Sequence, residues 1–305
     1  APGVRLLGAG GSLVTGNTIT RSSPGVLLDG ADGNAVEGNA FFQDDVAVDV
    51  RDSSGNAVGS NSVSESADTG VLVRGASDGN TIGGNAIARS ARGVAVLGGA
   101  GNDVAGNALA QDGLGVLIES PGNAATGNSI EDTPVGIQVV AAPGAVVDGN
   151  AVVRAATGIL VQASDGSSVT NNVATLCADG VLVEASAGAS VNHNAASDNA
   201  RGIVLRASPS AVVLANNVFS NTANGIDIDG SPLTVLHENN MAGNKPYGLF
   251  VTNSGPLELN AEDNYWGATT GPQAPDNPSA KGDKVSEGVD YKPASTEQFY
   301  GSGPQ

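Results

Sequence analysis

A short sequence unit recurs at intervals of about 22 residues along almost the whole chain, and this repeat limits the fold more than any other feature. Each unit opens with a small residue, continues with an alternating apolar stretch, and carries an asparagine further on. The opening residues are Gly3, Gly25, Ala47, Gly70, Gly93, Gly115, Gly136, Gly158, Gly180, Gly202, Gly225 and Gly248. The asparagine markers are Asn17, Asn39, Asn61, Asn85, Asn107, Asn128, Asn150, Asn172, Asn194, Asn217, Asn240 and Asn264. Because both markers keep phase, the sequence predicts a stack of equivalent structural units.

The apolar residues inside each unit alternate with a period of two, which indicates strands and not helices. After Gly25, for example, Val26 and Leu28 would face one side, and a second short strand would centre on Val36. A third apolar position follows the marker asparagine by two, as at Phe41. Three short strands in so short a unit exclude helical repeats and four-stranded propeller blades. We therefore expect an all-β parallel β-helix, or solenoid, of about 11–12 coils over residues 1–264.

Stacking of the coils explains which residues recur. Equivalent residues of neighbouring coils would lie about 4.8 Å apart, so that like side chains stack on like. The marker asparagines are expected at a bend, where each amide can bond the backbone and the next asparagine. Glycine would supply corner conformations that β-branched residues disfavour. Phe41 and Phe219 are expected on the core column.

The repeated units, of the form G-N-x-V-x-G-N, resemble those of right-handed β-helix repeat proteins, including NosD-like and pectate-lyase-like members. The resemblance runs from Gly3 to Asn264 and implies a right-handed coil. The stretches EDNYWGATTGP and GDKVSEGVDYKP, between Glu262 and Pro293, look like the closing motif of bacterial and archaeal surface proteins of this kind. The family includes lyases, hydrolases, epimerases and non-catalytic surface proteins, so it leaves the activity open. The copper suggested by the NosD name finds no ligand set among two histidines, one methionine and one cysteine.

The repeat ends near the C-terminus, where from Thr269 proline, glycine, serine and lysine become frequent. We expect residues 265–305 to form a C-terminal cap and tail. Tyr265 and Trp266 would plug the last coil, because an open coil exposes both core and strand edge. Residues 294–305 are expected to fray. The chain begins almost directly in the repeat, so we expect a mature or excised piece.

The charge and the apolar pattern exclude two classes of partner. The net charge is −18 although only 14% of residues are charged, which argues against nucleic acid because its binders need basic patches. No stretch approaches the roughly 20 apolar residues that a membrane span needs, so insertion in a membrane is not expected. The single cysteine, Cys177, excludes a disulfide framework within the chain.

A mostly aliphatic stripe is predicted on the outer face of the first strand of each coil. Its members are Leu27, Leu72, Leu117, Leu160, Leu182, Val204 and Phe250. Such a patch favours an interface, either for self-association or for another surface protein. The alternatives are that the tail or a long turn covers it, or that a β-rich surface tolerates single apolar residues.

The sharpest acidic group is formed by Asp227 and Asp229, whose carboxylates would share one face, with Arg206 one coil below Asp229. Polysaccharide lyases and hydrolases use clustered acids for calcium binding or acid–base catalysis. We favour the simpler interpretation, a ladder of salt bridges that joins Asp229 to Arg206 and likewise Asp29 to Arg51.

A second acidic group surrounds Arg51 and comprises Asp44, Asp45, Asp49 and Asp52. It is a candidate for a weak Ca²⁺ site, but a solvated acidic bend explains it more simply. No other cofactor or metal is predicted.

The uniform length of the units decides between a catalyst and a scaffold. The near-constant spacing of the opening residues leaves no long insertions to wall a cleft, and few aromatic residues face outward for sugar stacking. We therefore favour a non-catalytic extracellular or cell-surface module, such as an adhesin, stalk or assembly unit, with the periplasm as the alternative location. Polysaccharide is one expected partner. The rival hypothesis is a polysaccharide lyase, hydrolase or epimerase that acts on an acidic or neutral polysaccharide through Asp227, Asp229 and Arg206.

Overall fold

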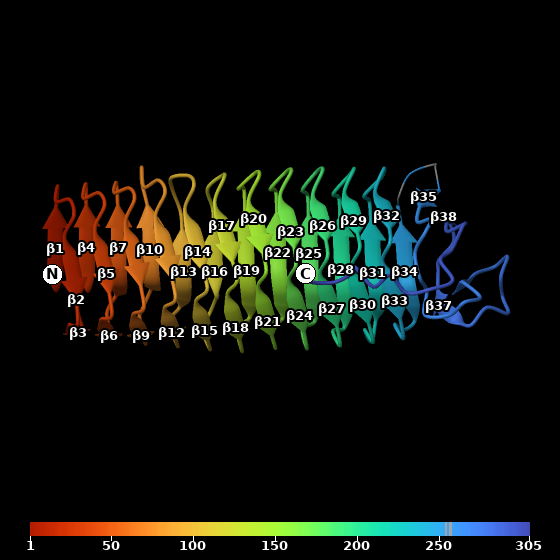
Figure 1. Ribbon diagram of the computed structural model, residues 1–305, viewed down its shortest axis with the longest axis horizontal. Helices are drawn as coiled ribbons and strands as arrows, with labels where there is room; N and C mark the ends of the chain where they lie inside the picture. The colour runs from red at the N-terminus through yellow and green to blue at the C-terminus, as the bar shows by residue number, and fades with distance from the viewer. Residues whose placement is uncertain (254, 256–257) are drawn as a thin grey trace. The chain divides into compact units, whose positions relative to one another are not determined.

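The computed structural model describes residues 1–253, 255 and 258–305, and all of the regular structure in these residues is β (Figure 1). The chain divides into two compact units, residues 1–146 and 147–305. In each unit the successive turns contribute strands to three parallel sheets, here called sheets 1, 2 and 3. The predicted parallel β-solenoid of about 12 turns, with about 22 residues in each, is confirmed.

The first unit contains six or seven strands of each sheet. Its sheet 1 consists of β1 (Val4–Leu7), β4 (Val26–Asp29), β7 (Val46–Arg51), β10 (Thr69–Arg74), β13 (Arg92–Val96), β16 (Val116–Ile118) and β19 (Val135–Val140). Its sheet 2 consists of β2 (Leu13–Thr15), β5 (Ala35–Glu37), β8 (Ala57–Gly59), β11 (Thr81–Gly83), β14 (Asp103–Ala105) and β17 (Ala124–Thr126). Its sheet 3 consists of β3 (Thr18–Thr20), β6 (Ala40–Phe42), β9 (Ser62–Ser64), β12 (Ala86–Ala88), β15 (Ala108–Ala110) and β18 (Ser129–Glu131).

The second unit continues the same pattern. Its sheet 1 consists of β22 (Thr157–Gln162), β25 (Asp179–Glu184), β28 (Arg201–Arg206), β31 (Asn224–Asp229) and β34 (Tyr247–Thr252). Its sheet 2 consists of β20 (Val146–Asp148), β23 (Ser168–Thr170), β26 (Ser190–Asn192), β29 (Val212–Leu214), β32 (Val235–His237), β35 (Leu259–Asn260) and β38 (Val289–Asp290). Its sheet 3 consists of β21 (Ala151–Val153), β24 (Val173–Thr175), β27 (Ala195–Ser197), β30 (Asn217–Phe219) and β33 (Asn240–Ala242). A small two-stranded sheet, β36 (Pro272–Gln273) and β37 (Gly282–Lys284), follows the last turn.

The glycine that opens each turn is required by a close approach and not by its backbone angle. A Cβ atom on Gly25 would lie 2.6 Å from the carbonyl oxygen of Ala47 and 2.8 Å from the ring of Phe41. Residues with positive φ occur instead just after the sheet 3 strands, where Gln43 and Arg89 have φ of 57° and 55°. Other glycines supply corner conformations, as expected, since Gly38 and Gly106 directly follow sheet 2 strands and have φ of 64° and 62°.

A ladder of buried asparagines joins the turns, as predicted. The backbone N–H of Asn39 donates to Oδ1 of Asn61 at 2.9 Å, and its side-chain amide donates to the same oxygen at 3.1 Å. In the second unit the ladder runs through Asn194, Asn216 and Asn239, and not through the residues that follow them.

The predicted markers Asn217 and Asn240 are therefore one residue too late, because each lies second in a pair of asparagines. The shift also moves the expected core residue. Val218 is completely buried, whereas Phe219 is only half-buried on the outer side of β30.

The C-terminal residues pack against the last turn, and they are here called the cap. Trp266 is completely buried, and Tyr265 is half-buried and bridges Asn240. Another column of asparagines, at the bend after sheet 3, runs through Asn199, Asn221 and Asn244. Asp283 of the cap ends this column by accepting hydrogen bonds from the backbone N–H of Asn244 at 2.9 Å and from its amide at 2.8 Å. The cap thus supplies the acceptor that the next asparagine would have provided.

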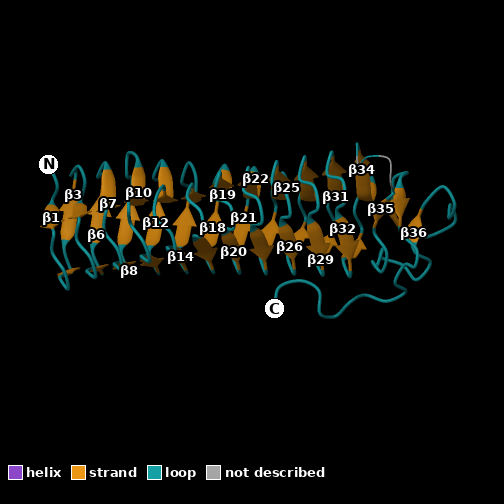
Figure 2. Cartoon of the chain, turned by 90° about the horizontal axis from the view of Figure 1, so that it is seen from above, coloured by secondary structure: helices purple, strands orange, loops and turns teal. Residues whose placement is uncertain are grey.

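The last residues are docked on the second unit. Figure 2 shows this segment running back along the turns of that unit from the capped end. Asn240 accepts a hydrogen bond from the N–H of Phe299 and donates one to its carbonyl, both at 2.9 Å. The amide of Asn217 donates to the carbonyl of Ser302, and Gly303 donates to the carbonyl of Ala215. The expectation that residues 294–305 fray is therefore wrong for residues 299–303, because outward asparagines bind their backbone.

The aliphatic stripe lies on the outer face of sheet 1 but is largely buried. Leu27, Leu72 and Leu117 are only 5–6% exposed, and Val204 is 1% exposed. In the first unit Leu72 and Leu117 pack with Val46, Ala95, Leu97 and Leu114 in a small cluster outside the solenoid core. Neighbouring side chains of the stack cover one another, which leaves little apolar area for a partner. The role of the stripe as an interface stays a prediction.

Candidate functional site

A cleft with a volume of about 610 Å³ opens between β34 and the cap. Its floor is the outer face of β34, with Tyr247, Phe250 and Thr252. Its wall comes from the cap, with residues such as Gln273, Pro278 and Lys284. The walls that the uniform repeat cannot provide are thus supplied by the aperiodic C-terminal segment.

Two aromatic side chains form the floor of this cleft. Gly248 and Leu249 turn inward between Tyr247 and Phe250, so both rings remain on the outer face of β34. Their centroids are 5.0 Å apart and their planes are inclined by 41°. The ammonium group of Lys284 lies 4.6 Å from the centroid of the Tyr247 ring, which is a cation–π contact. The pair presents a partly exposed apolar surface with polar groups at its edges.

Charged residues on the next strands lie beside this aromatic floor. Asp227 is opposite Phe250 in the strand register. Arg201 donates two hydrogen bonds to Asp179, at 2.6 and 2.8 Å, and lies 3.7 Å from Asp227. The amide of Asn224 also donates to Asp227, at 3.3 Å. Bonding to Asp179 raises the pKa of Arg201, so its positive charge is fixed and already neutralised.

The second predicted acid, Asp229, is engaged by other neighbours. Its Oδ1 accepts hydrogen bonds from Asn253 at 2.7 Å and from Thr252 at 3.0 Å. These bonds lower the pKa of Asp229, and the nearby charge of Arg206 contributes less. The structure therefore places Asp227 and Asp229 on one strand face with Arg206 on the adjacent rung, as predicted. The lowered pKa favours the charged form of Asp229, which weakens this carboxylate as a base.

A second hollow of about 510 Å³ adjoins the cleft and shares residues 285–287 with it as lining. Among the described residues, its lining includes one cation, Lys292, and four acids, namely Glu258, Asp276, Glu287 and Asp290. Lys292 forms an ion pair with Asp276, which also accepts a hydrogen bond of 2.5 Å from the hydroxyl of Tyr291. These bonds lower the pKa of Asp276. The surroundings of the cleft are therefore acidic, and the cation among them is paired.

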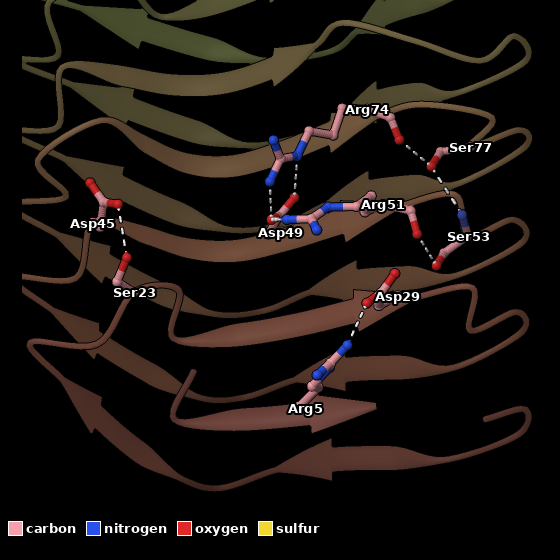
Figure 3. A network of polar contacts seen from close by, with 9 residues as sticks. All are labelled: Arg5, Ser23, Asp29, Asp45, Asp49, Arg51, Ser53, Arg74 and Ser77. Atoms are coloured by element: carbon pink, nitrogen blue, oxygen red, sulfur yellow. Dashed lines mark hydrogen bonds and ion pairs between the residues drawn. The ribbon is translucent and has the colours of Figure 1, made fainter. Parts of the chain in front are cut away.

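The acidic group predicted in the first unit does not converge on one point. Asp49 is 2% exposed and accepts two hydrogen bonds from Arg74, at 2.9 and 2.6 Å, and one from Arg51 at 3.1 Å (Figure 3). Asp45 accepts instead from the hydroxyl of Ser23, at 3.0 Å. The bond that was expected between Asp29 and Arg51 is replaced, because Asp29 pairs with Arg5 at 2.8 Å.

The other two members of that group serve the backbone. Asp44 accepts a hydrogen bond from the N–H of Ser22 at 2.7 Å, and Asp52 accepts from the N–H of Ala76 at 3.0 Å. Within the described ranges no group of three or more His, Cys, Asp or Glu side chains is placed to hold a metal ion. A Ca²⁺ site at these four aspartates has no geometric support.

Sequence reasoning missed most of the cleft. Phe250 appears in the predicted stripe, but Tyr247, Lys284 and the cap residues do not appear as site candidates. A compositional signal was present, since all four tyrosines and all four lysines lie between residues 245 and 300. No helix in the part of the chain that the structure describes is long and apolar enough to cross a membrane.

Fold and site together define a parallel β-helix protein with a cleft that has an aromatic floor. The family model described as "Periplasmic copper-binding protein (NosD)" matches residues 1–113 and 111–261, and the chain therefore belongs to the NosD family. Comparison with curated proteins finds no match.

Several solved structures share the fold. A mutant of the periplasmic alginate epimerase AlgG aligns with 81% of this chain at 16% identity and a TM-score of 0.52, and the chain spans 62% of its length. The A-module of the Azotobacter vinelandii mannuronan C-5 epimerase AlgE4 aligns with 97% of this chain and 91% of its own, at 16% identity and a TM-score of 0.52. These similarities support the right-handed parallel β-helix, and at such identities they show the fold alone.

The residue types that bind copper do not assemble in this chain. Met241 is completely buried, and the thiol of Cys177 is buried and donates to the carbonyl of Thr175. Burial raises the pKa of the Cys177 thiol, which opposes the thiolate form that a metal needs. Nδ1 of His237 lies 3.0 Å from the carbonyl oxygen of Glu262, while His193 lies at a turn with φ of 54°. The donor set does not fit a copper site.

Proposed function

We propose that this chain is a non-catalytic β-helix module that binds polysaccharide in the cleft between β34 and the cap. The proposal places it outside the cytoplasm, at the cell surface or in the periplasm, because the NosD family is described as periplasmic and the similar AlgG structure is that of a periplasmic protein. Both similar structures are enzymes that act on a polysaccharide, which supports the ligand class.

The aromatic floor is the observation that carries this proposal. Sugar rings have apolar C–H faces and polar edges, and they bind best where a partly exposed ring lies among hydrogen-bonding groups. Tyr247 and Phe250 provide the apolar surface, and Thr252 and Gln273 provide donors and acceptors at its rim. The nearest carboxylate on the sheet, Asp227, is held by Arg201 and Asn224. Because its carboxylate already has these partners, Asp227 is better suited to a site that binds a ligand than to one that transfers protons.

Binding can be tested by isothermal titration with a panel of soluble oligosaccharides. Replacing an aromatic anchor commonly costs at least about 1.4 kcal/mol, which is about tenfold in Kd. We therefore expect Tyr247→Ala and Phe250→Ala each to weaken binding by about tenfold or more. The matched control is Phe42→Ala, because Phe42 is an aromatic residue that is 39% exposed on β6 of the first unit. Equal affinity in all three variants would refute the cleft as the binding site.

A carbohydrate-active enzyme remains the second candidate, because Asp227 lies directly beside the aromatic floor. A lyase or epimerase would need a base near the sugar and a cation near its carboxylate, and Asp227 with Arg201 is the pair that could serve. Incubation with uronate polymers and Ca²⁺, followed by the absorbance of unsaturated products and by NMR for epimerised residues, tests this hypothesis. Turnover that Asp227→Asn abolishes would overturn the non-catalytic proposal.

A further inference from the structure

The charges around the cleft indicate which kind of polysaccharide it binds. This inference rests on the proposed function. Only one cation, Lys284, is among the described residues that line the cleft, and Glu287 lines it as well. The ammonium group of Lys284 is already directed at the ring of Tyr247. The lining thus carries one charge of each sign and no surplus of positive charge.

Two cations near the cleft, Arg201 and Lys292, are committed to acids of this chain. Arg201 is bound by Asp179 at 2.6 and 2.8 Å and approaches Asp227 at 3.7 Å. Lys292, which lines the adjoining hollow, is paired with Asp276. A ligand carboxylate would have to displace one of these internal partners, and the displaced acid would then remain close to it.

The electrostatic potential around the cleft is also negative. The described residues that line the adjoining hollow include four acids and one cation, and the whole chain carries a net charge of −18. Several like charges within about 10 Å of the ligand repel a polyanion at moderate ionic strength. An uncharged ligand meets no such cost, because stacking on an aromatic ring and hydrogen bonding by hydroxyl groups need no charge.

We propose that the cleft takes an uncharged glycan, whose ring stacks on Tyr247 and Phe250 while its hydroxyl groups bond Gln273, Lys284 and Glu287. Glu287 accepts hydrogen bonds from hydroxyl hydrogens, and Lys284 donates to hydroxyl oxygens. The ligand class is therefore a neutral polysaccharide segment and not a polyuronate.

The test compares neutral and acidic hexasaccharides on the full chain by isothermal titration, at about 20 mM and about 500 mM NaCl. The neutral probes are cello-, manno- and maltohexaose, and the acidic probes are the hexamers of mannuronate and galacturonate. We expect at least one neutral probe to bind with a Kd that changes less than about twofold between the two salt concentrations. The uronates should bind about tenfold more weakly or worse at low salt. Phe250→Ala should weaken the neutral binding by about tenfold or more, and Phe42→Ala should leave it unchanged.

Two variants sharpen the comparison. Glu287→Gln should reduce the difference in Kd between the uronate and the neutral probes, because the substitution removes a negative charge and keeps a hydrogen-bonding group. One result would overturn the assignment of a neutral ligand and leave polysaccharide binding in place. In that case a uronate would bind more tightly than every neutral probe, and its binding would weaken at high salt and disappear in Lys284→Gln. If no probe binds at either salt concentration, the binding function and this inference both fall.

Discussion

Replacing Asp112 by asparagine should stabilise the protein at neutral pH. Asp112 is 1% exposed at the bend after β15, where its Oδ1 accepts a hydrogen bond of 2.7 Å from the N–H of Ser90. Its Oδ2 is buried without a hydrogen-bond partner. In the second unit the corresponding residue is Asn199, whose amide donates to the carbonyl of Ala174 at 2.9 Å.

The geometry shows that Oδ2 of Asp112 occupies the place of an amide donor. It lies 3.2 Å from the Cβ position of Gly93, and the amide nitrogen of Asn199 lies 2.9 Å from the Cβ position of Gly180. By the strand register it therefore faces the carbonyl of Ile87, the equivalent of Ala174. A charged carboxylate cannot donate there, whereas a protonated one or an asparagine can.

Burial raises the pKa of Asp112 from 3.8 to about 6. A shift of about two pH units corresponds to roughly 3 kcal/mol. Since the folded state holds this proton more tightly than the unfolded state, the carboxyl costs stability above about pH 6. The cost fades as the pH falls from about 6 towards 3.8. Asp112→Asn should thus gain up to about 3 kcal/mol at pH 7 and much less at pH 4.

Urea unfolding of the wild type and of Asp112→Asn at pH 7 and pH 4 measures this difference, and the matched reverse substitution is Asn199→Asp. The reverse variant should be destabilised at pH 7 and should recover as the pH falls. A gain in Asp112→Asn that is equal at both pH values, or no gain at pH 7, would refute the assignment of Oδ2 to a donor position.

Two further substitutions test the cap and the docked tail. Asp283→Ala should lower the stability of the second unit by about 2 kcal/mol or more in thermal unfolding, because it removes the acceptor of three N–H groups at Gly243 and Asn244; an unchanged unfolding temperature would contradict this role. Asn240→Ala should release residues 299–303, seen as faster hydrogen exchange at Phe299, and should leave the fold intact. The control variant Asn239→Ala, at the neighbouring position, should instead destabilise the ladder, and equal effects of the two substitutions would contradict their separate roles.

The architecture could be predicted from the sequence because almost every repeat unit carries the same pattern of residues. Each coil needs an inward apolar triplet, a bend asparagine and a small opening residue, so an error in one coil does not change the prediction. The error at Asn217 and Asn240 shows where local information fails. Both residues of each pair fit the pattern, and only the register of the stack selects Asn216 and Asn239 for the ladder.

The cleft could not be predicted because its wall has no period. The even spacing of the opening residues correctly excludes long insertions within the coils. It carries no information about residues 273–287, which fold against β34 as part of the cap. The ion pairs were only partly predictable, since the register places Asp29 beside Arg51 but the side chain turns to Arg5. A long arginine side chain can form an ion pair with an acid on either neighbouring strand, and the sequence does not determine which pair forms.

The central claim, that the aromatic cleft binds a polysaccharide without altering it, is tested most directly by a single NMR titration of a neutral oligosaccharide. Shifts confined to the rings of Tyr247 and Phe250 and to residues 273–287, with sugar signals that broaden but stay chemically unchanged, are the predicted result. Shifts located elsewhere, or new anomeric signals that appear with time, would contradict it.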